Sequence, residues 1–206
     1  MTMTPALGDS SGPSFETLET ILAVNYSWGY QETREKLRDL YTKAKHSQWI
    51  PEEVLPWHIQ PDFEKSMGPE ELLPLFGSAI WGRMTQPERV KMTLETSAWT
   101  LSQFLHGEQG ALLAAAQLVD SVPDLDSKLY GASQVVDEAR HVDVYNRYLH
   151  EKIGFSYPVN RHLKTLLDMV LKDSRWDMKF LGMQIMVEGL ALAAFAMIRN
   201  NTPDPL

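Results

Sequence analysis

The stretch Glu138-Ala139-Arg140-His141 decides how this chain folds. Residues three apart share one face of an α-helix, so the carboxylate of Glu138 and the imidazole of His141 point the same way. The surrounding sequence is that of a helix built to be buried. A buried carboxylate without a partner is costly, so the sequence predicts a positive group that compensates it.

Two more glutamates interrupt apolar helical stretches in the same way. Glu108 lies within residues 104–113 and Glu188 within residues 186–192. Helix-borne Glu, Glu-x-x-His and Glu form three of the four parts of a ligand set that holds two metal ions in some helical bundles. The fourth part, a second Glu-x-x-His, does not occur in these 206 residues. We predict Glu108, Glu138, His141 and Glu188 as metal ligands.

The spacing about Pro123 brings two of these glutamates together. Glu108 and Glu138 are each fifteen positions from Pro123, where a tight turn between two helices is expected. Both helices rise at the same rate, so both carboxylates should lie roughly 22 Å from the turn on neighbouring antiparallel helices. Glu108 and Glu188 also belong to apolar helical stripes, so their side chains should point inward.

Several neighbours have two interpretations each. Asp137 and Arg140 either orient a metal-bound imidazole as supporting residues or form ordinary ion pairs. Gln184 is placed to support Glu188. Tyr145, one turn beyond His141, is either a redox-active tyrosine or a core tyrosine bonded to a carboxylate. Small residues near the ligands either leave a cavity for dioxygen and substrate or allow close helix approach; they include Gly107, Gly110, Ala111, Gly182, Gly189 and Ala191.

Composition narrows the choice of metal and partner. The chain has no cysteine, so any metal must bind through Glu, Asp and His, and this mixture favours iron, with manganese or a mixed Mn/Fe pair as alternatives. A net charge of -8, without a basic block, argues against nucleic acid or an anionic membrane as partner. The first residues lack the pattern of a signal peptide, and the apolar stretch 185–198 is shorter than a membrane span, so we expect a cytoplasmic protein.

The pattern along the chain is all-α. Residues 1–14 are expected to form a flexible leader and residues 15–206 one helical domain, incomplete at its C-terminus. Four prolines predict an irregular segment over 50–68. A short helix, kinked or interrupted near Pro74, is expected over 70–82. Longer helices are expected over residues 31–48, 86–119, 125–152, 161–172 and 174–199, the last with a capped start.

The string Asp137-Glu138-Ala139-Arg140-His141 resembles the Asp-Glu-x-Arg-His motif of the ferritin-like, ribonucleotide-reductase-like di-iron carboxylate proteins. Residues 30–206 are similar to the aminobenzoate N-oxygenase group, including a lead-in helix around Leu40-Tyr41. The resemblance implies a ferritin-like di-iron bundle with an extra N-terminal helix and the four ligands named above. It also implies that the fourth ligand-bearing helix is missing from this chain, so we expect this form to be inactive.

The resemblance implies a non-haem di-iron monooxygenase or oxidase with two iron ions. Its partners would be dioxygen, a small organic substrate and an external electron donor such as a ferredoxin or flavin reductase, and a homodimer is an open alternative to a monomer. Three alternative functions stay open. They are a radical-generating protein like the ribonucleotide reductase small subunit, a ferritin-like ferroxidase without organic substrate, and a helical scaffold that does not catalyse.

Overall fold

The computed structural model describes residues 16–63, 68–202 and 204. Within these residues the chain is helical and contains no strand, which confirms the all-α prediction. The expected leader over 1–14 lies outside the described residues.

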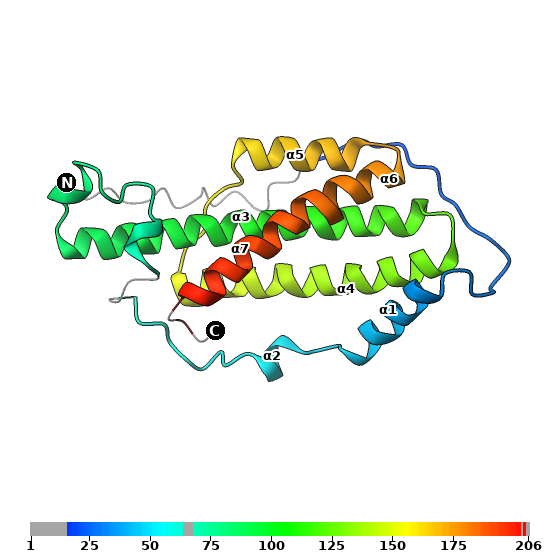
Figure 1. The fold of residues 1–206 in the computed structure, drawn as a ribbon, viewed down its shortest axis with the longest axis horizontal. Helices are drawn as coiled ribbons and strands as arrows, with labels where there is room; N and C mark the ends of the chain where they lie inside the picture. Colours follow the sequence, from blue (N-terminus) through cyan, green and yellow to red (C-terminus); the bar gives the residue numbers. More distant parts are fainter. Residues whose placement is uncertain (1–15, 64–67, 203, 205–206) are drawn as a thin grey trace.

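Two long antiparallel helices, α3 (Gln86–Ser121) and α4 (Leu125–Arg147), form the centre of the fold (Figure 1). Helix α3 begins with a capping box in which the Thr85 backbone N–H donates to Glu88 over 2.7 Å. Asp124 is the N-cap of α4, and its carboxylate accepts a hydrogen bond from the Ser127 backbone N–H. Only three residues separate the helices, so the tight turn predicted near Pro123 is present. A π-helical segment, Tyr148–Ile153, extends α4 and ends at Gly154 (φ 89°).

The C-terminal half forms a second layer over this pair. Helix α5 (Arg161–Lys172) lies along α3, with the bounds that the sequence predicts. Helix α6 (Trp176–Lys179), a π-helical segment (Phe180–Val187) and α7 (Glu188–Asn201) form one continuous rod that crosses α3 and α4 obliquely (Figure 1). The capped start expected at 174–177 is wrong, because Arg175 occupies the N-cap without a side-chain hydrogen bond to the helix.

The N-terminal half wraps around the outside of the bundle. Helix α1 (Glu35–His46) packs on α4, and the one-turn α2 (Pro51–Val54) lies within an otherwise irregular segment, as predicted. The helix expected over 70–82 is interrupted near Pro74, one of the two predicted alternatives, but the flanking pieces are short 3-10 turns, Glu70–Leu72 and Trp81–Arg83. Pro74 lacks a backbone donor and Gly77 adopts a left-handed conformation (φ 74°), so a helix cannot continue through this segment.

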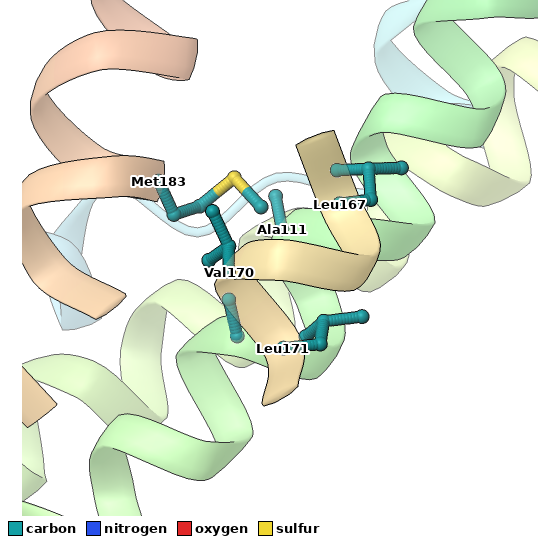
Figure 2. Close-up of a cluster of buried hydrophobic side chains, with 6 residues drawn as sticks. Ala111, Leu167, Val170, Leu171 and Met183 are labelled. Carbon is teal, nitrogen blue, oxygen red and sulfur yellow. The ribbon is translucent and has the colours of Figure 1, made fainter. Parts of the chain in front are cut away.

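The hydrophobic core lies where α3, α5 and the π-helical segment Phe180–Val187 meet (Figure 2). Its buried members are Ala111, Ala114, Leu167, Val170, Leu171 and Met183. Two glycines allow the helices this close approach. A Cβ on Gly110 would lie 2.5 Å from Leu167 Cδ2, and one on Gly182 would lie 2.9 Å from Val170 Cγ2. The small residues at 110 and 182 therefore serve packing.

Much of the α6–α7 rod is uncovered. The rod is long and apolar enough to cross a membrane by length and composition alone, and very little of its most apolar window is buried. Glu188 lies in its middle, which is a poor feature for a membrane span. The large exposed apolar side chains of the rod are Trp176, Met178, Phe180, Leu181, Ile185, Met186, Leu190, Leu192 and Met197. We call these residues the open face.

A buried carboxylate fixes the outer layer to the bundle. The Asp126 side chain, fully buried in the first turn of α4, accepts backbone N–H bonds from Thr33 and Arg34, both 2.8 Å long. Arg38 of α1 pairs with its other oxygen at 2.6 Å. These hydrogen bonds, with the charge of Arg38, hold the pKa of Asp126 below its usual range.

Substituting each of two glycines in α3 should have opposite effects on stability. We expect Gly110→Ala to lower the free energy of unfolding by about 1–3 kcal/mol, because Leu167 must move. Gly107→Ala should raise it by about 0.5–1 kcal/mol, because a Cβ there meets nothing within 4 Å and alanine favours the helix. Urea unfolding of both variants checks this, and equal destabilisation would contradict it.

Asp126→Asn should destabilise the protein in a pH-dependent way. The folded-state pKa of Asp126 is lowered, so its charge contributes stability above its unfolded pKa of about 3.9 and loses that contribution as pH falls through the folded value. The Tm of the variant should lie below that of the wild type by a constant amount above about pH 5, and the gap should shrink below about pH 4. A gap that grows on acidification would contradict this account.

Candidate metal centre

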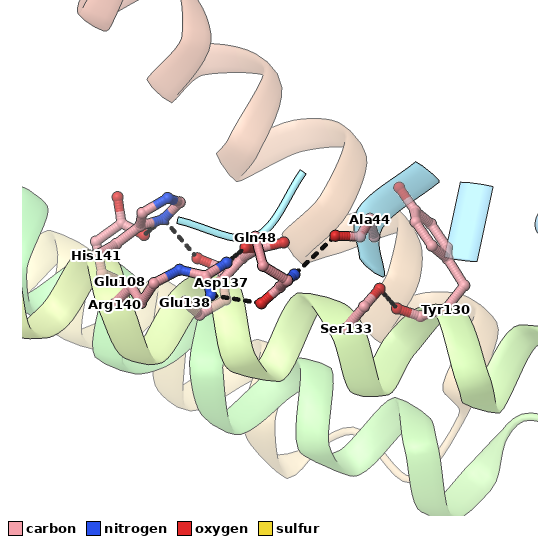
Figure 3. Close-up of polar contacts among 9 residues, drawn as sticks. All are labelled: Ala44, Gln48, Glu108, Tyr130, Ser133, Asp137, Glu138, Arg140 and His141. Atoms are coloured by element: carbon pink, nitrogen blue, oxygen red, sulfur yellow. Dashed lines mark hydrogen bonds and ion pairs between the residues drawn. The ribbon is translucent and has the colours of Figure 1, made fainter. Parts of the chain in front are cut away.

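Three of the four predicted ligands meet between α3 and α4. His141 Nδ1 lies 3.1 Å from Glu108 Oε2 and 3.2 Å from Glu138 Oε2 (Figure 3). One ligand atom from each residue lies within 4.8 Å of the others, and among the described residues this is the group whose spacing suits a metal ion. The pairing of Glu108 with Glu138 follows from their equal distance from the turn, as the sequence predicts.

The group places two carboxylates and one imidazole together, two of them well buried. The side chains of Glu108 and Glu138 are 7% and 9% exposed, whereas that of His141 is 41% exposed. Burial raises the pKa of Glu138, and hydrogen bonds to Glu108 and Glu138 raise the pKa of His141 to about 10. Without a metal, the imidazole is therefore protonated at neutral pH. Because the imidazole faces two carboxylates, a divalent ion bound here would compete with this proton.

Glu188, the fourth predicted ligand, lies outside this group of three. It is half-buried at the start of α7, and its pKa is raised by burial and by the charge of Glu138. Gln184, one turn earlier, accepts a hydrogen bond of 3.0 Å from Gln134 of α4 rather than bonding to Glu188. The third helix thus brings its carboxylate near the site without joining the ligand group.

Asp137 and Arg140 face the outer layer. They pair with each other, and Arg140 donates a 2.6 Å hydrogen bond to Gln48 (Figure 3). The Arg140 guanidinium also lies over the Trp49 ring, 5.4 Å from its centroid. These are the contacts of an ion pair that fixes the segment after α1. Within the part of the chain that the structure describes, neither residue forms a hydrogen bond with the imidazole of His141.

Tyr145 lies in an aromatic cluster beside the site. Its ring packs with Phe104 of α3 and Phe195 of α7, at centroid distances of 6.1 and 6.4 Å. Burial, followed by the charges of Glu108 and Glu188, raises its pKa above the usual range. The phenol therefore keeps its proton. Within the described residues its hydroxyl forms no hydrogen bond to a carboxylate, so that interpretation is not supported.

The small residues divide into two groups. The space beside Gly110 and Gly182 is filled by the side chains of Leu167 and Val170 in the core. A Cβ on Gly107 or Gly189 would meet nothing within 4 Å, so the positions next to Glu108 and Glu188 leave open space. Close helix approach therefore holds at Gly110 and Gly182, while neither Gly107 nor Gly189 lines the cavity that the structure describes, so the expected cavity for dioxygen stays a prediction.

The residues present fit one metal ion. Two carboxylates and an imidazole suit iron or manganese, and their positions on two rigid helices fix the ligand atoms. Binding two ions would require Glu188 to approach and further ligands to be added.

The sequence interpretation missed a cavity next to this site. It has a volume of about 640 Å³ and is bordered by α3, α4, α7 and residues 68–73. Its polar lining includes hydroxyl residues spaced by three and four positions along α3, a spacing that is visible in the sequence: Thr93, Thr96, Ser97 and Thr100. That α7 closes the other side is visible only in the structure.

Comparison with protein-family models, with curated proteins and with solved structures finds no match for this chain. The class of the protein therefore rests on the geometry of its fold and of this site.

Substitution of the ligands should remove metal binding. We expect His141→Ala and Glu138→Ala to weaken Fe(II) binding at least about tenfold, because each loses a ligand and leaves the remaining buried charges unbalanced. Metal analysis after anaerobic loading measures this. His150→Ala is the matched control, since His150 is exposed and bonds only to the Asn146 carbonyl among the described residues.

Glu188→Gln tests whether the fourth predicted ligand takes part. Weaker binding would assign Glu188 to the centre, and unchanged binding would leave it outside. Full retention of iron by His141→Ala would contradict the assignment of the centre itself.

Proposed function

We propose that this protein is a non-haem di-iron oxygenase or oxidase, which uses dioxygen to oxidise a small organic substrate. The observation that carries the proposal is the convergence of Glu108, Glu138 and His141 inside an antiparallel helix pair. Burying two carboxylates beside one imidazole destabilises a fold unless a cation binds there. Iron is the metal we propose, because carboxylates and histidine both suit it.

The proposal includes a completed, ferritin-like ligand set. Glu188 would join from α7, and a second Glu-x-x-His would come from a helix outside these 206 residues. The open face supports this part of the proposal, because it leaves an apolar rod uncovered beside Glu188. A further amphipathic helix seated there would bury the rod and bring its ligands to the same centre.

The residues of the chain would bind and orient the iron and shield it from bulk water. Iron bound here would supply the electrons that reduce dioxygen. Glu108 and Glu138 are held by the two long helices and are buried, which excludes bulk water from their side of the centre. The Tyr145 ring, packed with Phe104 and Phe195, would shield the centre on that side. Electrons for further turnovers would come from an external ferredoxin or flavin reductase.

One observation favours a second candidate. Tyr145 is a protonated phenol in an aromatic surrounding, one turn from His141, which is the setting of a redox-active tyrosine. The second candidate is therefore a radical-generating protein like the small subunit of ribonucleotide reductase. Tyr145→Phe separates the two, since it would abolish a tyrosyl radical signal but leave iron-dependent oxygen uptake.

Oxygen consumption by the iron-loaded protein tests the proposed function. We expect the Fe(II)-loaded protein with its completed ligand set, supplied with a reductant, to consume dioxygen faster than free iron, and Glu108→Ala and Glu138→Ala to reduce the excess rate to the background. An oxygen electrode measures both. His150→Ala should behave as the wild type. An excess rate that survives Glu138→Ala would contradict the proposal.

The same experiment without reductant distinguishes an oxygenase from a ferroxidase. An oxygenase oxidises only the iron that it holds and then stops. A ferritin-like ferroxidase continues to oxidise added Fe(II) and accumulates ferric mineral. Continued oxidation of many equivalents per chain would replace the proposed function by an iron-storage one.

A further inference from the structure

The cavity of about 640 Å³ has a defined shape and lining. Along α3 it extends from Thr93 to Leu101, and the eight steps between these residues rise about 12 Å. Its opposite walls are mostly apolar and come from three different elements, with Leu73, Val144 and Ile198 as examples. A volume of this size lies within the range of sites that bind small organic molecules.

A row of hydroxyl groups lines the α3 wall. Thr93, Thr96, Ser97 and Thr100 share one face of the helix, at spacings of three and four. Thr93 and Thr100 donate to the carbonyls of Arg89 and Thr96, both at 2.9 Å. The hydroxyls of Thr96 and Ser97 form no hydrogen bond with the described residues, so they can donate to a ligand.

Arg199, in the last turn of α7, is the positive residue among those that line the cavity. It is exposed and forms no ion pair with the residues that the structure describes. The acidic residue of the lining, Asp204, already accepts a hydrogen bond from the Tyr148 hydroxyl. The described lining therefore carries one positive charge, at Arg199, and one carboxylate, at Asp204, whose oxygen accepts the hydrogen bond from the Tyr148 hydroxyl.

Aromatic rings form part of the cavity wall. Tyr145 and Phe195 line it, and Phe104 packs on Phe195 at 4.8 Å between centroids. Phe104 lies one turn before Glu108, and Tyr145 lies one turn after His141. The aromatic cluster thus separates the cavity from the candidate metal centre by about one helical turn, or about 5 Å along the helices.

We propose that this cavity binds an elongated organic anion, with its charged end at Arg199 and its apolar chain extending toward Tyr145. The charge follows from Arg199, and the length follows from the distance along α3. The hydroxyls of Thr96 and Ser97 would donate hydrogen bonds to polar atoms of the bound anion. The proposal rests on the proposed function only in that the buried end of the chain would be the part oxidised; binding itself requires no metal.

Calorimetric titration of the metal-free protein tests the proposal. The probes are decanoate, the neutral decan-1-ol, the cationic decylammonium and the short benzoate. Decanoate should bind more tightly than the other three. Arg199→Gln should weaken decanoate about fivefold, as expected for a partly exposed ion pair, and leave decan-1-ol unchanged. Arg161→Gln, which removes an exposed arginine at the start of α5, should change neither.

Two more variants locate the binding site. Ser97→Trp fills the cavity and should abolish binding of both decanoate and decan-1-ol. Leu190→Gln on the open face should leave both unchanged, which excludes binding to that face. Far-UV circular dichroism checks the fold of Ser97→Trp. Arg199→Gln, at an exposed position, still tests the proposal if Ser97→Trp does not fold.

Two results would overturn the proposal. One is equal affinity for decanoate, decan-1-ol and decylammonium. The other is decanoate binding that Arg199→Gln does not change or that Leu190→Gln abolishes. Because these titrations use metal-free protein, they are independent of the iron experiments. Decanoate binding without iron binding would remove the proposed function alone, and iron binding without decanoate binding would remove this proposal alone.

Discussion

The structure depends on two buried carboxylates that share one imidazole. Glu108 and Glu138 lie inside the bundle, and the hydrogen bonds from His141 compensate only part of their charge. This arrangement is possible because α3 and α4 are joined by a short turn and run side by side, so each carboxylate is fixed by its own helix. A charged pair of this kind costs stability when it is incompletely neutralised, which is why its presence points to a bound cation.

Helix α4 connects this centre to the outer layer through cationic side chains on its other faces. Arg140 contacts Gln48 and the Trp49 ring, and Arg147 lies 4.1 Å from the centroid of the Trp57 ring. Lys152 donates to the carbonyls of Trp57 and Ile59. The backbone hydrogen bonds in the described part of the proline-rich segment stay within the segment, so these cations and indole rings hold it against the bundle. The same helix therefore carries ligands on one face and fixes the outer layer with another.

The second layer, formed by the C-terminal half, leaves the site open on one side. The α6–α7 rod reaches across α3 and α4, brings Phe195 into the aromatic cluster and places Arg199 at the cavity. Its outer surface remains uncovered, and the His141 side chain remains 41% exposed. Both facts have one physical explanation under the proposed function, since a further helix on the open face would cover the rod and complete the ligand set.

The sequence by itself determined the helices and the pairing of Glu108 with Glu138. Helical periodicity is a local property, and equal distance from a turn becomes spatial proximity whenever two helices are antiparallel. The sequence indicated a kink or interruption near Pro74 but not the short 3-10 turns around it, left open whether Asp137 and Arg140 form an ion pair, and did not determine the separation of Glu188 from the ligand group. Only the tertiary structure decided these, along with the cavity between Thr93 and Arg199. Each depends on the angle at which α7 crosses the other helices or on the path of a proline-rich segment, and both are set by packing between residues far apart in the chain.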